Sequence, residues 1–280
     1  MDIVIIIPAY NEEENIGNCL LSLLHQSYPA QLILVVDDGS TDQTPHILKR
    51  LTAQYPNLNF ISKEKSFQHE AGSKIIEAFN FGFQSLSNDY DILCKFDADL
   101  IFPEDYLDIL NSNFENQSKL GMFGGFCTIE IQGEWALENL TNEDHIRGAL
   151  KSYRKACFQD IDGLVSAMGW DTIDEMKARY QGWKVNTDKN LRVKHLKPTG
   201  KLYSKSLPKV FGESLFRMHY SLALAFITCL KMAITKRQAR FFLISFFAFL
   251  KSNSKENTFL VSPEEGEFIR KYRWKKIKER

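Results

Sequence analysis

Asp97 and Asp99, two aspartates one residue apart, are the pair in this chain whose type and spacing could most directly do chemistry. They follow an apolar run over residues 90–96, which predicts a buried strand that ends just before them. Paired carboxylates supply the hard oxygen ligands that Mg²⁺ or Mn²⁺ prefers, and such an ion usually completes its shell with phosphate oxygens. The pair therefore indicates a divalent-metal site for a phosphorylated ligand.

A second acidic cluster also follows an apolar run. Asp37 and Asp38 come directly after residues 32–36, and another β-branched run covers residues 3–7. Strands that alternate with helices at this spacing predict right-handed βαβ units and a mostly parallel sheet, and in such sheets ligands bind at the carboxyl ends of the strands. We therefore expect one edge of the sheet to carry Tyr10, Asp37, Asp38, Asp97 and Asp99.

The elements that must position these side chains follow from the same patterns, and together they predict an α/β fold. Apolar residues at helical spacing predict helices near residues 12–25, 44–54 and 71–87, the first of them capped by Asn11, and a short strand near 59–62. The second half is less regular. There the sequence predicts one or two strands over 122–132, a loop or short helix over 134–147, helices over 151–161 and 170–180, and a strand pair over 184–196.

The C-terminal part differs in character. Residues 218–230 and 241–250 contain no Asp, Glu, Lys or Arg, but each run is shorter than the roughly 20 residues that span a bilayer. Two interpretations remain: a buried helical hairpin, or a hairpin on a membrane surface, helped by the basic tail over 270–280. We expect an N-terminal domain over residues 1–205 and a C-terminal helical extension over residues 206–280, which associates with a membrane under the second interpretation.

Composition sets wider limits. The chain has 280 residues, 44% of them hydrophobic, which is enough for one substantial α/β core with an appendage. Lys and Arg number 35, as do Asp and Glu, so net charge gives no indication of nucleic acid, and none is expected as a partner. The five cysteines have no metal-site spacing, and no basic region precedes the first apolar run. We expect a cytoplasmic protein, peripheral on the inner membrane face if the hairpin contacts lipid.

Three motifs carry a family resemblance. Residues 6–12 (Ile-Ile-Pro-Ala-Tyr-Asn-Glu), 35–42 (Val-Val-Asp-Asp-Gly-Ser-Thr-Asp) and 96–99 (Phe-Asp-Ala-Asp) closely resemble the family-two glycosyltransferases with a GT-A fold, in order and in spacing. The resemblance implies a nucleoside diphosphate sugar as donor, Mg²⁺ or Mn²⁺ as cofactor, and inversion at the anomeric carbon. The implied acceptor is a hydroxyl of a glycan or a lipid-linked acceptor in cell-surface polysaccharide biosynthesis.

The resemblance also implies roles for single residues. The base and ribose would lie against Pro8, Ala9, Tyr10 and Glu12. Asp38 would contact the nucleotide with support from Asp37, and Asp97 would serve both the ribose and the metal. Asp99 is the expected direct metal ligand, and His195 lies where some members place a histidine near the metal. From its position after Gly72-Ser73, Lys74 could complement the phosphates, although a lysine on a helix surface is the common alternative.

Inversion requires a general base for the acceptor hydroxyl. In the family this base is an Asp in a Glu-Asp motif at the start of a helix, and here Trp170-Asp171 aligns with it, with Trp in place of Glu. Asp171 is therefore the preferred base, with Asp174 and Glu175 as alternatives; negative charge in the first turn of a helix is their other explanation.

Two alternative functions each fit part of the sequence. A sugar nucleotidyltransferase would carry a Gly-rich, basic loop after the first strand, where this chain has Ala9-Tyr10-Asn11-Glu12. A catalytically degenerate scaffold that binds nucleotide sugars fits the altered Trp170-Asp171, but it gives no reason to keep two repelling carboxylates at Asp97 and Asp99.

Overall fold

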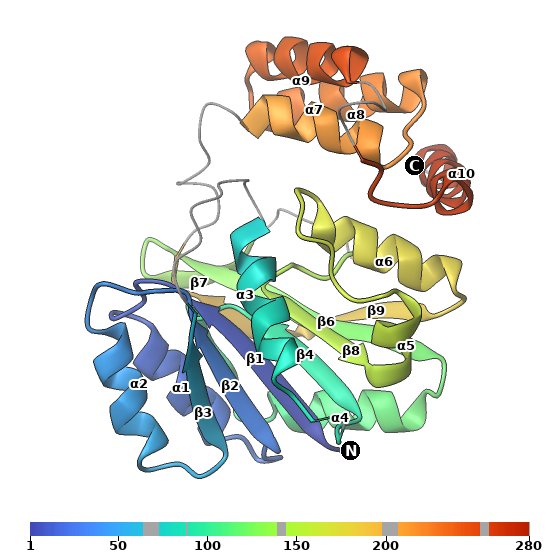
Figure 1. Cartoon of the computed structure of the whole chain (residues 1–280). Helices are drawn as coiled ribbons and strands as arrows, with labels where there is room; N and C mark the ends of the chain where they lie inside the picture. Colours follow the sequence, from blue (N-terminus) through green and yellow to red (C-terminus); the bar gives the residue numbers. More distant parts are fainter. Residues whose placement is uncertain (64–72, 88, 139–143, 198–206, 253–257, 280) are drawn as a thin grey trace.

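A single mixed sheet organises the N-terminal part of the protein (Figure 1). The computed structural model describes residues 1–63, 73–87, 89–138, 144–197, 207–252 and 258–279. Within these residues nine strands follow the order β3-β2-β1-β4-β8-β6-β9-β5, and β7 pairs with β6. The predicted α/β fold with a mostly parallel sheet flanked by helices is confirmed.

The first four strands of this order form the parallel half. They are β1 (Ile3–Ala9), β2 (Leu32–Asp37), β3 (Leu58–Ser62) and β4 (Ile92–Phe96). Every residue of β1 and β4 is buried, which explains their continuous apolar runs: helices cover both faces, so neither face can be polar. The register sets Ala9 beside Asp37 and Ile6 beside Lys95, so these strands end at one edge.

The other half of the sheet contains both parallel and antiparallel strand pairs. Its strands are β5 (Leu100–Ile101), β6 (Leu120–Ile131), β7 (Glu134–Leu137), β8 (Leu150–Arg154) and β9 (Lys184–His195). The β6 and β9 strands are parallel, whereas β8 is antiparallel to β4 and β6, and β5 is antiparallel to β9. The short β5 strand carries the segment after β4 across to β9.

Helices flank the sheet on both faces (Figure 1). They are α1 (Ile16–Leu24), α2 (Thr44–Thr52), α3 (Ser73–Gln84), α4 (Tyr106–Asn116), α5 (Lys155–Asp160) and α6 (Trp170–Tyr180). Close packing requires glycine at the contact of α3 with the sheet, where a Cβ on Gly82 would lie 2.6 Å from Val36 and 3.1 Å from Ile6. This contact brings the N-terminal turn of α3 toward the carboxyl edge of the strands.

Four sequence predictions were wrong in detail. Residues 134–147 contain the strand β7, residues 151–161 divide between β8 and α5, and residues 184–196 form one long strand rather than a pair. The β9 strand stays continuous because a register irregularity against β6, near Gly124, absorbs its polar middle. Asn11 does not cap a helix, because α1 begins at Ile16 after a turn.

The C-terminal helices have a hydrophobic core of their own. They are α7 (Leu207–Arg217), α8 (Leu222–Thr235), α9 (Ala239–Lys251) and α10 (Pro263–Lys278). This core includes Ile173 and Met176 of α6, so α6 belongs to both packing units. The predicted boundary at 205/206 lies outside the described residues, and the division into two domains stays a prediction.

The basic C-terminal residues are not a separate tail, because they form most of α10. That helix is anchored to the N-terminal unit through Asp144, which accepts a hydrogen bond from Tyr272 at 3.1 Å and pairs with Lys276 at 2.9 Å. A capping box at Ser262 and Glu265 fixes its first turn. In the part of the chain that the structure describes, no helix has the length and apolar character to cross a bilayer.

Candidate active site

The first two motif loops meet at the carboxyl edge of β1 and β2. The Asp38 amide donates to the Ala9 carbonyl at 2.9 Å, which continues the pairing beyond the strands. Asn11 adopts a left-handed backbone conformation with φ of 53°. Its amide donates to Ser40 Oγ at 2.9 Å, and its side-chain oxygen accepts from the Thr41 amide at 2.8 Å. Asn tolerates this conformation better than most residues, which explains its place in the loop.

The two carboxylates after β2 have different surroundings. Asp37 is buried, and its Oδ1 accepts a hydrogen bond from the Ser40 amide at 3.1 Å, so it shapes the turn. Asp38 Oδ1 lies 3.2 Å from Lys63 Nζ, and the same Nζ lies 3.9 Å from Glu77 of α3. Lys63 therefore links the edge of the sheet to α3, whose first turn contains Lys74.

Glu12 and Tyr10 lie at the same loop. Glu12 Oε2 accepts from Asn15 at 3.0 Å and from Lys197 Nζ at 2.7 Å, so it joins the loop after β1 to the segment after β9. Tyr10 is 43% exposed, whereas Pro8 and Ala9 are buried in β1.

Asp97 follows β4 and forms an ion pair with Lys95, which is almost fully buried. Lys95 Nζ also donates to the Gly148 carbonyl at 3.0 Å and lies 5.3 Å from the centre of the Trp170 ring. A buried ammonium needs such partners, because burial of an unpaired charge is costly. Lys95 thereby connects Asp97 to the first residue of α6.

Asp99 lies on the way to β5 and is brought against His195 at the end of β9. The pairing of Leu100 with His195 sets this position, and Asp99 Oδ2 lies 3.4 Å from His195 Nε2. Burial alone would lower the pKa of His195, but the carboxylates of Asp99 and Glu138 raise it to about 9. The predicted proximity of this histidine to the acidic pair is thus present in the structure.

These donor atoms fit a divalent ion. Adjacent ligands of an octahedral Mg²⁺ or Mn²⁺ with bonds near 2.1 Å lie about 3 Å apart, close to the separation of Asp99 Oδ2 and His195 Nε2. The Asp97 carboxylate is held by Lys95 and would have to exchange partners to become a ligand. The geometry therefore favours Asp99 and His195 as ligands over Asp97.

The start of α6 presents one partly exposed carboxylate. The Asp171 side chain is 35% exposed, and its Oδ2 lies 3.6 Å from Nε2 of His145. Burial would raise the pKa of Asp171, but the hydrogen bond and charge of His145 lower it to about 2. Nδ1 of the same imidazole lies 3.1 Å from Glu175. Asp171 is therefore ionised at neutral pH and oriented by His145.

Asp174 and Glu175 lie in a buried network instead. Lys151 Nζ is 3.1 Å from Asp174 and 2.8 Å from Glu175, and both carboxylates are 2% exposed. Tyr153 donates to Asp174 at 2.5 Å. Burial raises the pKa of Asp174 to about 7 despite the charge of Lys151. Burial would also raise the pKa of Glu175, but Lys151 and His145 hold it below its usual value. Asp174 and Glu175 therefore connect the N-terminal half of α6 to β8.

Sequence reasoning missed several members of the site, among them Lys63, Lys95, Glu138, His145, Lys151 and Tyr153. A signal was present for Lys95 and Lys151, since each is the only charged residue within a run of buried positions of its strand. A lysine at such a position requires an acidic partner. No comparable local pattern marks His145 or Glu138, which lie within the polar stretch over 134–147.

The comparisons with known proteins agree with this geometry. Residues 4–156 match the family model described as glycosyl transferase family 2, which is more than half of the chain. The chain belongs to glycosyl transferase family 2. The segment matched includes all three motifs and the strands that position them, and the predicted family is confirmed.

One curated relative is a dolichyl N-acetyl-α-D-glucosaminyl phosphate 3-β-D-2,3-diacetamido-2,3-dideoxy-β-D-glucuronosyltransferase of Methanococcus voltae. It is 33% identical over 122 residues, which cover 42% of this chain and 34% of the relative. Because this chain spans about a third of that relative, the relative's whole activity does not carry over.

Two solved structures resemble the chain in fold. Residues 1–349 of TarS from S. aureus, solved with UDP-GlcNAc, have a TM-score of 0.61 and 20% identity, with 96% of this chain and 78% of that chain covered. The mannosyltransferase PcManGT from Pyrobaculum calidifontis, solved with GDP-Man and Mn²⁺, has a TM-score of 0.57 and 18% identity, with 89% of this chain and 69% of that chain covered. These likenesses confirm the GT-A fold of this family-2 chain.

Proposed function

We propose that this glycosyltransferase transfers a sugar, with inversion, from a nucleoside diphosphate donor to a hydroxyl of a glycan or lipid-linked acceptor in cell-surface polysaccharide biosynthesis. The observation that carries the proposal is the position of Trp170. Its ring lies over Lys95, the partner of Asp97, while the next residue is the partly exposed Asp171. A donor-side acid and a candidate base therefore flank one tryptophan.

In the proposed reaction the acceptor hydroxyl gives its proton to the Asp171 carboxylate. The acceptor oxygen attacks the anomeric carbon from the face opposite the diphosphate, and the bond from that carbon to the diphosphate oxygen breaks. The nucleoside diphosphate leaves with the electron pair. His145 holds Asp171 in position through Nε2 at 3.6 Å, and Glu175 in turn holds His145. Asp174 and Glu175, the alternative bases, are too enclosed to meet an acceptor.

Donor binding is proposed at the carboxyl edge of the strands. Tyr10 would stack on the base above Pro8 and Ala9, and Asp38 would accept hydrogen bonds from the nucleotide. The nearby Glu12 and Asp37 would shape this pocket, and Asp97 would accept from the ribose. Lys74 would complement the phosphates from the first turn of α3. The solved complexes of TarS with UDP-GlcNAc and of PcManGT with GDP-Man support a nucleotide sugar as donor.

Asp99 and His195, with Asp97 nearby, would hold Mg²⁺ or Mn²⁺ as the cofactor. A bound ion of this kind would neutralise charge on the leaving group. The Mn²⁺ in the PcManGT structure supports this part of the proposal.

A test of donor and metal needs no acceptor. Thermal shift and calorimetric titration with a panel of nucleotide sugars, with and without Mn²⁺, should give a metal-dependent response for one nucleotide, and Asp99→Ala should abolish it. Glu104→Ala, which alters an exposed acid beyond β5, serves as the matched control. A wild type that responds to no donor would contradict the proposed donor site.

A cytoplasmic, membrane-peripheral location is part of the proposal, because a lipid-linked acceptor lies at a bilayer. The apolar stripe of α8 (Leu222, Phe226, Leu230 and Ile234) is 40% to 69% exposed at four-residue spacing. Phe226 contacts Phe242 and Phe246 of α9 with ring centres 5.2 and 5.4 Å apart, and α9 adds further exposed apolar residues. The sequence between Glu213 and Glu256 holds several Lys and Arg residues but no acidic one, which suits an anionic lipid surface.

A further inference from the structure

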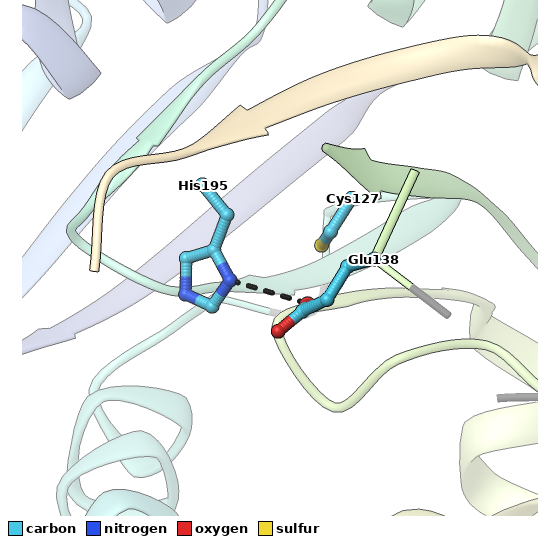
Figure 2. Close-up of side chains that lie close together, drawn as sticks. All are labelled: Cys127, Glu138 and His195. Carbon is cyan, nitrogen blue, oxygen red and sulfur yellow. Dashed lines mark ion pairs between the residues drawn. The ribbon is translucent and has the colours of Figure 1, made fainter. Parts of the chain in front are cut away.

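Three buried side chains lie close together near the end of β9 (Figure 2). They are Cys127, Glu138 and His195, which are 2%, 8% and 6% exposed. One ligand-type atom from each lies within 4.8 Å of the others. Burial of a carboxylate carries a desolvation cost, which a charged or hydrogen-bonding partner must offset.

Strand pairing places each member of this group. Leu100 of β5 pairs with His195, which holds the imidazole against Asp99. Cys127 of β6 pairs with Val193 of β9, two residues before His195. The β7 hairpin returns the chain so that the Glu138 amide donates to the Cys127 carbonyl at 3.0 Å. The arrangement is therefore fixed by the sheet rather than by mobile side chains.

The two imidazole nitrogens have separate partners. Nε2 lies 3.4 Å from Asp99 Oδ2, whereas Nδ1 lies 3.5 Å from Glu138 Oε2. Figure 2 shows Glu138 on one side of the ring, with the other nitrogen directed away from it. A histidine that binds a metal through one nitrogen commonly donates the N–H of the other to a carboxylate, which fixes the tautomer and the ring plane.

A metal held directly by the three residues fits less well. Glu138 Oε2 lies 3.1 Å from Arg147, whose guanidinium already neutralises the carboxylate and would repel a cation. Cys127 is enclosed and would be a soft sulfur ligand, whereas Mg²⁺ and Mn²⁺ prefer oxygen ligands. Both observations favour a supporting role for Glu138.

We propose that Glu138 is a positioning residue that accepts the Nδ1 proton of His195 and thereby directs Nε2 toward the cation beside Asp99. The inference rests on the proposed function, because it assumes a divalent cation at that point. Arg147 holds the Glu138 carboxylate in place, and Cys127 lies close by without binding the ion.

Metal binding tests the inference directly. Mn²⁺ affinity is measured by electron paramagnetic resonance titration of the full chain with the nucleoside diphosphate that the wild type binds. Glu138→Ala should weaken Mn²⁺ binding about 10- to 100-fold. Glu138→Gln, whose amide oxygen can still accept from Nδ1, should retain more of the Mn²⁺ affinity than Glu138→Ala. This conservative variant keeps the size of the side chain, so the inference can be tested even if Glu138→Ala fails to fold. Cys127→Ala and the exposed control Glu134→Gln should bind Mn²⁺ as the wild type does.

A second readout reports the tautomer. In the diamagnetic Mg²⁺ complex, ¹⁵N NMR should show His195 protonated at Nδ1 in the wild type, and Glu138→Ala should lose this preference. Unchanged Mn²⁺ affinity in Glu138→Ala would overturn the inference, and so would loss of binding in Cys127→Ala, which would make the cysteine a ligand. A wild type that turns over donor but binds no Mn²⁺ would overturn the inference and the metal site while leaving the transfer reaction in place.

Discussion

Position on α6 separates three carboxylates that the sequence alone left as alternatives. Asp171 lies in the first turn with a third of its side chain exposed, while Asp174 and Glu175 are enclosed with Lys151. The pattern of one helix turn could not distinguish them, because the difference comes from β8, a strand that the sequence did not predict. Residue roles near α6 thus depend on long-range packing, whereas the motif loops after β1 and β2 were evident from local pattern.

Asp171→Asn should reduce kcat about 10²- to 10⁴-fold, since that is the usual contribution of a positioned general base. Donor affinity should not change, because the proposed role of Asp171 is to take the proton of the acceptor hydroxyl. Transfer kinetics and nucleotide titration on the same preparation measure both effects. Asp174→Asn should mainly lower thermal stability. If the Asp174→Asn protein were stable but inactive while Asp171→Asn stayed active, the general base would be Asp174.

His145→Gln should change how stability depends on pH. Burial would lower the pKa of His145, but Asp171 and Glu175 raise it to about 9, above its ordinary value of 6.5. The ionised pair therefore stabilises the fold fully below pH 6.5, and this stabilisation is lost as pH rises toward 9. Urea unfolding of the wild type should show a decline in unfolding free energy over that range that the variant lacks. Equal slopes in the two proteins would contradict a charged His145.

At the scale of elements, alternation of buried strands and helices made the parallel half of the sheet predictable. The strand β7 was not predictable, because its four residues are exposed or half-buried and include a charged one. It forms a strand through its pairing with β6, which the local sequence does not show. Glu138 follows that strand, so an element hidden from the sequence pattern also hid a site residue. The long β9 strand was missed for a related reason, since its polar middle looks like a turn.

Gly212→Ala tests the contact between α7 and α9. A Cβ at Gly212 would lie 1.9 Å from the Ser245 carbonyl oxygen, which is backbone and cannot give way. The helices would have to separate, at a cost of about 1 to 3 kcal/mol of unfolding free energy. Gly17→Ala is the matched control, because the nearest atom to its Cβ would be at 3.9 Å, and it should be neutral or stabilising. Equal stability of the two variants would contradict the close packing of α7 on α9.

The hairpin of α8 and α9 makes a prediction about membranes. Leu243 and Phe247 of α9 are each 59% exposed, and exchange of both for Ser should weaken binding to anionic vesicles about 10-fold or more, since each side chain would lose its burial in lipid. Sedimentation with vesicles at low and high salt measures this. Ile131→Ser, which removes an exposed apolar residue of β6, should have no effect. If the wild type does not bind anionic vesicles, the proposed binding of this hairpin to a membrane surface is wrong.

At the scale of the whole molecule, α6 joins the two packing units. It carries Asp171 at its start, contributes Ile173 and Met176 to the C-terminal core, and packs against α10. The sequence predicted the apolar character of both C-terminal runs but not this connection, because contacts between distant segments leave no local periodicity. The proposed base therefore lies on the helix that packs against the C-terminal helices.

The measurement that tests the central claim most directly is proton NMR of the sugar released when the enzyme turns over its preferred nucleotide sugar with Mn²⁺. Water takes the place of the acceptor in this assay. We expect release of the nucleoside diphosphate together with a sugar whose first-formed anomer is opposite to that of the donor, and loss of both products in Asp171→Asn. A first-formed anomer that matches the donor, or no cleavage of any nucleotide sugar, would contradict an inverting glycosyltransferase.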